Sequence, residues 1–258
     1  MFEQDRALVR LQQRVLADDV VLVCFLSGSY GRRQEDAYSD MDIALVYEND
    51  SSRERAWQNR RDFVQSVNPY VAVKSFDAVH IRPYFHIALF ANGAKLDFRF
   101  ETFATLQPNP WDKDIRILKD HNNWAETFQT ECQQLAFPRP HLTNQDLTEL
   151  DNRFWVMFMD VFRLLLRGDT HKPFTIYLQL LHFTLPPLLA VLPPEDAAYD
   201  PLFRAKYGTN PADIRQHMVG LLDAYVAART AVIRRLNLSF VPNSTFENEI
   251  QRLVKRKV

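Results

Sequence analysis

The sequence predicts an α+β chain, in which a sheet-containing N-terminal half is followed by an all-helical C-terminal half. As far as residue 100, short runs of β-branched and aromatic residues alternate with turn signals, a pattern typical of strands. Beyond Phe137-Pro138-Arg139-Pro140 this alternation stops, and apolar residues recur at helical spacing. We therefore expect an α/β domain over residues 1–137 and a helical-bundle domain over residues 143–258.

The composition of the 258 residues is typical of a globular protein, with 47% apolar and 24% charged side chains. The 31 basic and 32 acidic residues nearly cancel, and nucleic-acid-binding proteins usually carry a basic excess, so we expect no nucleic-acid partner. Cys24 and Cys132 lie far apart, as expected for reduced thiols. The first residues lack an apolar signal core, and the apolar run Val20–Leu26 is too short to span a bilayer, so we expect a cytoplasmic protein without a membrane partner.

The first elements follow from periodicity and capping. Apolar residues at helical spacing predict a helix over Glu3–Ala17. Apolar, strand-like runs follow over Val20–Leu26 and Met41–Tyr47. Asn49 is expected to cap a polar helix that runs to about Val67.

A hairpin is expected next. The segments Tyr70–Phe76 and Val79–Phe90 are predicted strands, and Ala91-Asn92-Gly93-Ala94 is a strong turn signal because Asn-Gly tolerates positive φ. The turn leads into a strand over Lys95–Phe100, whose apolar pattern is interrupted by Asp97.

In the C-terminal half, Thr143 and Asp146 form a predicted capping box at the start of a helix that ends at Gly168. Prolines separate the later helices. The expected helices are Leu147–Arg167, Phe174–Leu192, Ala212–Leu236 and Phe246–Lys257.

The chemistry is concentrated near the start of the second strand. Asp40 and Asp42 lie one residue apart, so their side chains point the same way, and they follow the turn Ser27-Gly28-Ser29 by ten residues. Anionic groups on one face beside such a turn suit a divalent cation and a polyphosphate, and Asp97 is a candidate third ligand.

Each feature also has a structural explanation. An Asp-x-Asp pair at a strand start often caps a turn, and Gly28-Ser29 alone is an ordinary turn. Asp97 could alternate outward to solvent together with Lys95 and Arg99, although burying it unpaired would be costly. The combined spacing of the three acids nevertheless favours a metal site.

This combination resembles the signature of the polymerase-β-type nucleotidyltransferase superfamily: Gly28-Ser29, ten residues, Asp40-Met41-Asp42, then Asp97 in a strand after a hairpin. Within it, the chain is most similar to the streptomycin-type 6-adenylyltransferases among the aminoglycoside nucleotidyltransferases. The segments Arg116–Asp120 and Asp151–Trp155 are part of that similarity. The resemblance implies a polymerase-β-like mixed sheet with flanking helices, followed by a helical bundle.

The resemblance also implies a reaction, the transfer of a nucleoside monophosphate, AMP from ATP, onto a hydroxyl of a small molecule such as an aminoglycoside. Two Mg²⁺ ions would be held by Asp40, Asp42 and Asp97. Gly28 and Ser29 would contact the phosphates.

Further residues have more open assignments. Arg32 and Arg33 follow the Gly-Ser turn and could grip the triphosphate or simply be solvated. Glu149 and Asp151 are candidates for a general base, because the resemblance implies a base supplied by a carboxylate of the helical domain. The alternative is that they are solvated acids of the first helical turn, which favour the helix dipole. The alternatives to the leading function are an enzyme that adenylylates a protein hydroxyl and a nucleotide-binding or interaction module without turnover.

Overall fold

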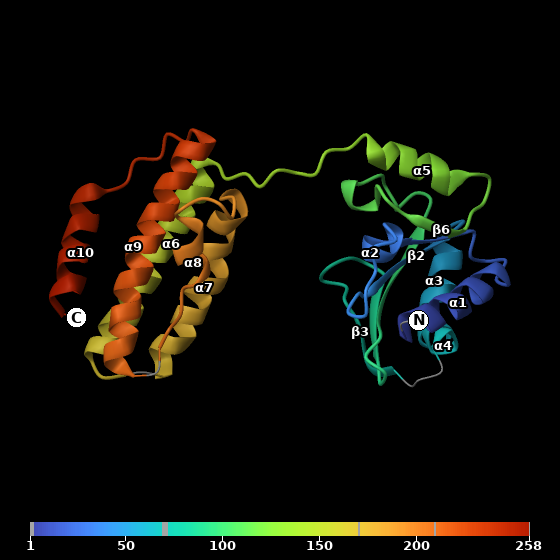
Figure 1. Ribbon diagram of the computed structural model, residues 1–258, viewed down its shortest axis with the longest axis horizontal. Coiled ribbons are helices and arrows are strands. Elements are labelled where there is room, and N and C mark those ends of the chain that lie inside the picture. Colours follow the sequence, from blue (N-terminus) through green and yellow to red (C-terminus); the bar gives the residue numbers. More distant parts are fainter. Residues whose placement is uncertain (1–2, 69–71, 170, 209, 258) are drawn as a thin grey trace. The chain divides into compact units, whose positions relative to one another are not determined.

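The computed structural model describes residues 3–68, 72–169, 171–208 and 210–257. It contains two compact units, Met1–Phe137 and Pro138–Val258 (Figure 1). The first holds a mixed six-stranded sheet with flanking helices, and the described part of the second is helical. This confirms the predicted α+β class.

The sheet has the strand order β3-β4-β5-β2-β1-β6. Its central pair, β2 and β5, is parallel, whereas the other neighbouring strands are antiparallel. The strands are β1 (Val23–Ser27), β2 (Met41–Tyr47), β3 (Ala72–Asp77), β4 (Phe85–Phe90), β5 (Lys95–Thr102) and β6 (Arg116–Lys119).

Helices cover both faces of this sheet (Figure 1). On one face, α1 (Glu3–Leu16), α3 (Asp50–Gln58) and α4 (Arg60–Val67) pack against alternate residues of β2 and β5. On the other face, α5 (Trp124–Gln133) packs against β1 and β2 through Phe128. Because side chains alternate along a strand, β1 and β2 contribute to both cores.

The sheet unit differs from the sequence prediction at several element boundaries. The helix expected to run from the Asn49 cap to Val67 ends after Gln58, and a new helix begins at Arg60; the cap itself is confirmed. The strand expected over Val79–Phe90 begins only at Phe85, because the preceding residues form a turn that contains Pro83 and a positive φ at Tyr84. The predicted strand Tyr70–Phe76 begins at Ala72 in the structure, and its residues 70–71 lie outside the described residues.

Four short elements of the sheet unit were not predicted. They are the four-residue helix α2 (Gly28–Gly31), the 3₁₀ turn η1 (Pro110–Asp112), strand β6 and helix α5. The predicted hairpin is confirmed, since β4 and β5 pair antiparallel around Gly93, whose φ is 85°.

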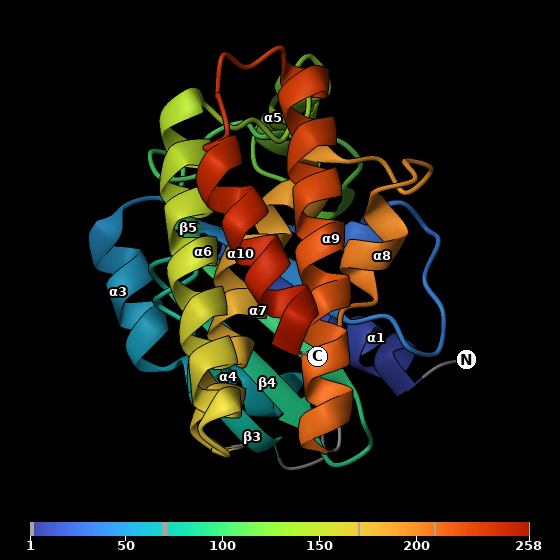
Figure 2. The same ribbon diagram turned by 90° about the vertical axis from the view of Figure 1, so that its left-hand side faces the viewer.

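The second unit is built from α6 (Asn144–Leu166), α7 (His171–Val191), α8 (Tyr199–Phe203), α9 (Pro211–Leu236) and α10 (Ser244–Lys257). Figure 2 looks onto these helices, with α6, α9 and α10 side by side. The predicted capping box of Thr143 and Asp146 begins α6. The core joins aromatic residues of α6, such as Phe154 and Phe158, to Tyr225 of α9.

By length and composition alone, α7 could cross a membrane. Core helices pass the same test, and α7 contributes Tyr177, Leu180 and Leu188 to the core of its unit. Packing therefore accounts for part of its apolar character, since 33% of its most apolar stretch is buried.

Candidate functional site

Strand pairing brings the three predicted carboxylates together. In the parallel pair of β2 and β5, Asp42 lies directly opposite Asp97, and Asp40 comes just before β2. One ligand oxygen from each of the three lies within 4.8 Å of the others. The Asp-x-Asp spacing thus becomes a three-carboxylate cluster, because parallel strands in register align the acids on one face.

The end of β1 completes this cluster. Gly28 follows β1 directly and has a φ of 63°, which glycine adopts at little cost. A Cβ at this position would clash with Asp42 Oδ2, so the backbone passes close to the carboxylate only because the residue is glycine. The predicted Gly-Ser turn and the predicted acids therefore form one local structure.

Like charges and burial shape the electrostatics of the cluster. Burial raises the pKa of Asp42, and the neighbouring Asp40 and Asp97 raise it further. Burial also raises the pKa of Asp97, and Lys95 offsets this only in part. The Lys95 ammonium lies 2.8 Å from Asp40 Oδ2 and 2.7 Å from Asp97 Oδ2. Three acids thus face one nearby ammonium group, which leaves an excess of negative charge.

The cluster has the properties of a site for a hard divalent cation. Carboxylate oxygens are the ligands that Mg²⁺ prefers. Asp97 Oδ1 is buried without any hydrogen-bond partner in the described part of the chain, which is costly unless a ligand satisfies it. The donor set, its spacing and this unsatisfied oxygen therefore fit a metal ion.

Beside the cluster lies a cavity of about 360 Å³, lined on one side by Gly28, Asp42 and Asp97. The other lining residues come from the sheet, the turn before β4 and the segment around η1: Ser27, Ile81, Arg82, Phe85, Arg99, Asn109, Trp111 and Asp112. A cavity next to clustered acids is where a substrate has room to bind.

A buried ion pair shapes this cavity. Arg99 donates two hydrogen bonds to Asp112, of 2.9 and 2.8 Å, and a longer one to Ser27. Burial alone would raise the pKa of Asp112, but its bonds to Arg99 outweigh that effect and hold the pKa below its usual range. The pair ties β5 to the loop that carries η1.

The predicted phosphate-binding residues lie at the end of β1. Gly28 and Ser29 begin α2 and are partly exposed, so both can reach a ligand. Arg32 and Arg33 are exposed, and Arg32 Nε donates a hydrogen bond to Gln34. The structure thus leaves both arginines at the surface just after the turn.

The two acids predicted as general-base candidates lie in α6 and differ in environment. Glu149 is exposed and accepts a hydrogen bond of 3.1 Å from Gln145. Asp151 is buried, 2.6 Å from Arg229 and 2.9 Å from the Tyr225 hydroxyl. Asp151 therefore belongs to a buried network of hydrogen bonds and ion pairs inside the helical unit.

Three residues of the site were not predicted as functional: Lys95, Arg99 and Asp112. Side chains alternate along β5, so Lys95 and Arg99 extend from the same face of the strand as Asp97. The sequence therefore indicated that these two residues lie near Asp97. The alternative in which Asp97 turns outward to solvent is wrong, because Asp97 is only 7% exposed and Arg99 is buried.

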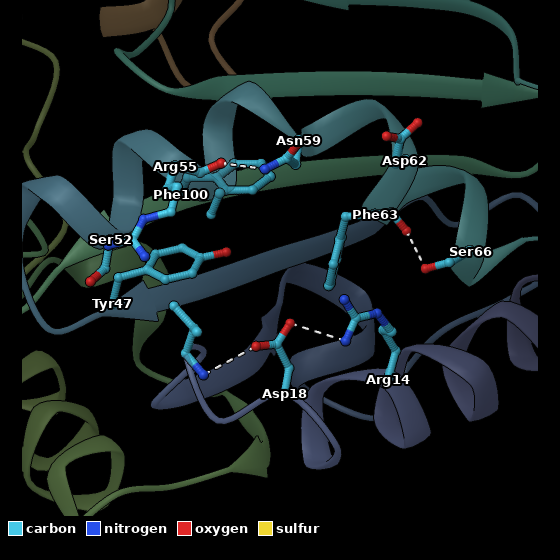
Figure 3. A pocket seen from close by; sticks show the side chains of 12 residues that line it. Arg14, Asp18, Tyr47, Ser52, Arg55, Asn59, Asp62, Phe63, Ser66 and Phe100 are labelled. Atoms are coloured by element: carbon cyan, nitrogen blue, oxygen red, sulfur yellow. Dashed lines mark hydrogen bonds and ion pairs between the residues drawn. The ribbon is translucent and has the colours of Figure 1, made fainter.

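Another cavity, of about 450 Å³, lies between the helices on the opposite face (Figure 3). Tyr47 and Phe100 of the sheet line it together with Phe63 of α4, and an ion pair of Arg14 and Asp18 lies at its rim. None of the three clustered carboxylates lines it. It is therefore separate from the candidate site.

The family found by comparison with known proteins agrees with the chemistry expected of the carboxylate cluster. The streptomycin adenylyltransferase family matches residues 5–179, more than half of the chain. The chain belongs to this family. It is therefore an adenylyltransferase, an enzyme that uses a nucleoside triphosphate.

Other comparisons are more distant. The chain is similar to an aminoglycoside 6-adenyltransferase from Bacillus subtilis, with 12% identity and a TM-score of 0.39 over 99% of this chain and 98% of that one. It is also similar to a nucleotidyltransferase-like protein from Exiguobacterium sibiricum 255-15, with 12% identity and a TM-score of 0.35 over 91% and 78% of the two chains. No curated protein sequence gave a significant match.

Proposed function

We propose that this adenylyltransferase moves AMP from ATP onto a hydroxyl group of a small molecule, at the cluster of Asp40, Asp42 and Asp97. The observation that carries the proposal is the parallel register that sets Asp42 opposite Asp97, with the Gly28 turn against them. A cytoplasmic location, where ATP and Mg²⁺ are abundant, fits this reaction.

The acceptor oxygen would attack the α-phosphorus of ATP, and pyrophosphate would leave. Two bound Mg²⁺ ions would neutralise phosphate charge and lower the pKa of the attacking hydroxyl. Asp40 and Asp42 would hold both ions, and Asp97 would complete the site. Gly28 and Ser29 would contact the phosphates beyond the reacting one, and Arg32 and Arg33 are near enough in sequence to assist. Positioning and charge neutralisation would supply most of the rate enhancement.

We assign the general base to Asp97. Its Oδ1 has no hydrogen-bond partner among the described residues, and Asp97 lines the cavity beside the cluster. A general base needs only to reach the acceptor hydroxyl within hydrogen-bond distance, and a carboxylate that lines the cavity is placed to do so. Asp151 suits the task less well, because Arg229 and Tyr225 already occupy its Oδ1. The role of Glu149 as a general base stays a prediction from the sequence.

The acceptor we favour is an aminoglycoside, so that the enzyme would confer resistance by modifying the drug. The name of the matching family, streptomycin adenylyltransferase, supports an acceptor of this class.

A pyrophosphate-release assay tests the proposal. The purified chain is mixed with Mg²⁺, each of the four common nucleoside triphosphates, and a panel of aminoglycosides, lincosamides and polyols. We expect release with ATP and an aminoglycoside, and a mass increase of one adenylyl group on that acceptor. Release with a protein acceptor only would contradict the small-molecule assignment. ATP binding without release in any mixture would indicate a nucleotide-binding module.

A further inference from the structure

The carboxylate cluster contains a built-in cation, the ammonium group of Lys95. Lys95 lies two residues before Asp97 on β5, so both side chains extend from the same face of the strand. The ammonium bridges Asp40 Oδ2 and Asp97 Oδ2 at 2.8 and 2.7 Å. Both contacts have ion-pair length, so the ammonium group is shared by two of the three acids.

Lys95 does not contact the three acids equally. Asp40 and Asp97 each give one oxygen to Lys95, whereas Asp42 accepts no side-chain hydrogen bond within the described part of the chain. The second oxygen of Asp97, buried Oδ1, is likewise without a partner there. The carboxylate oxygens of Asp42 are therefore free to bind a ligand, whereas Lys95 occupies one oxygen of Asp40 and one of Asp97.

A divalent cation bound by all three acids would share Asp40 and Asp97 with the Lys95 ammonium, which already contacts one oxygen of each. An ammonium and a divalent cation a few ångströms apart also repel each other, and partial burial keeps water from screening this repulsion fully. The two cations thus compete for the cluster.

We propose that Lys95 is the resident counter-cation of the cluster and keeps the affinity of the nucleotide-free protein for divalent metal low. It partly neutralises three acids that would otherwise repel one another. Metal would then bind well only when the phosphates of a nucleotide supply further ligands and negative charge. This inference rests on the proposed function, because it takes the cluster to be the metal site of that reaction.

An ordinary surface ion pair would have a different consequence. Such pairs contribute little, and removing one leaves a distant ligand site unchanged. Lys95 is instead only 38% exposed in its side chain and contacts two of the three candidate ligands directly. Removing the Lys95 charge should therefore tighten metal binding, whereas most mutations in a metal site weaken it.

Calorimetric titration with Mn²⁺, in the absence of nucleotide and at low salt, tests the proposal. Lys95→Met removes the charge while keeping an unbranched side chain, and we expect it to bind Mn²⁺ on the order of tenfold more tightly than the wild type. Lys95→Arg keeps the charge and should keep the low affinity. Lys172→Met makes the same charge change on the exposed surface of α7 and should leave affinity unchanged.

Equal or weaker Mn²⁺ binding by Lys95→Met would overturn the proposal. Asp42→Asn separates this failure from failure of the proposed function. If Asp42→Asn abolishes Mn²⁺ binding while Lys95→Met leaves it unchanged, the metal site stands and the role of Lys95 is wrong. If no variant binds Mn²⁺ differently from the wild type, the metal site itself is wrong.

Discussion

At the scale of single residues, the close approach of the β1 turn to Asp42 depends on Gly28. Its φ of 63° and the clash that a Cβ would make with Asp42 Oδ2 are two separate requirements for glycine. Gly93 meets only the first: its φ is 85°, and a Cβ there would have no atom within 4 Å. The two glycines therefore form a matched pair for experiment.

We predict that Gly28→Ala and Gly93→Ala each lower the free energy of unfolding by about 1 kcal/mol, the cost of a left-handed conformation for an L-residue. Only Gly28→Ala should also displace Asp42 and abolish adenylyl transfer. Urea denaturation and the pyrophosphate assay measure the two effects. Full activity in Gly28→Ala would show that the Asp42 position is not critical.

The raised pKa values of Asp42 and Asp97 make stability depend on pH. The folded protein binds these protons more tightly than the unfolded chain, so ionising the two acids costs stability. That cost grows as the pH rises through the ordinary carboxyl pKa and is complete above the raised one.

We therefore predict that Asp42→Asn is more stable than the wild type at pH 7 in the absence of divalent cations, and that its advantage shrinks as the pH falls toward about 4. Urea midpoints measured across this range provide the comparison. Adding Mg²⁺ together with ATP should stabilise the wild type more than the variant. A less stable Asp42→Asn at pH 7 would indicate that Asp42 makes favourable contacts instead.

The period-two rule is what made the acids predictable from the sequence. It placed Asp40 and Asp42 on one side of a strand, and the interrupted pattern around Asp97 marked a third acid. The Lys95 bridge and the Arg99–Asp112 pair were not predicted, because a strand pattern gives the face of a residue and not its partner in a distant segment.

At the scale of elements, a buried ionic network joins three helices of the second unit. Arg229 of α9, 1% exposed, donates to Asp151 of α6 and to Glu247 of α10 at 2.6 and 2.7 Å. Without Asp151, Arg229 would keep Glu247 as its counter-charge, but the buried Tyr225 hydroxyl would lose its acceptor, and an unsatisfied buried polar group is costly.

Asp151→Ala is accordingly predicted to lower the free energy of unfolding by about 2 kcal/mol. Glu149→Gln, on the exposed face of the same helix, should change it by less than about 0.5 kcal/mol. Thermal denaturation followed by circular dichroism distinguishes them. Comparable stability of the two variants would contradict the structural role of Asp151.

Elements with strong periodicity or specific turn chemistry were predictable, including β2, the Asn92-Gly93 hairpin and the Thr143 cap of α6. The turn before β4 was wrongly predicted as strand, because apolar residues there suggested a longer run. Helices α2 and α5 are short, and their position depends on packing against the sheet rather than on local pattern.

At the scale of the whole molecule, each unit has its own hydrophobic core, and the family match spans parts of both. The proposed metal ligands all lie in the first unit. The polar network of Asp151 lies in the second unit, so its loss should affect stability and leave Mn²⁺ affinity unchanged.

The central claim is that the three carboxylates carry out adenylyl transfer. Its most direct test is pyrophosphate release from ATP and an acceptor found by screening, compared between the wild type and Asp97→Asn at saturating Mg²⁺. Loss of a general base typically costs at least about 100-fold in kcat, so we predict a decrease of that size in a variant that remains folded. Near wild-type turnover by folded Asp97→Asn would contradict the account.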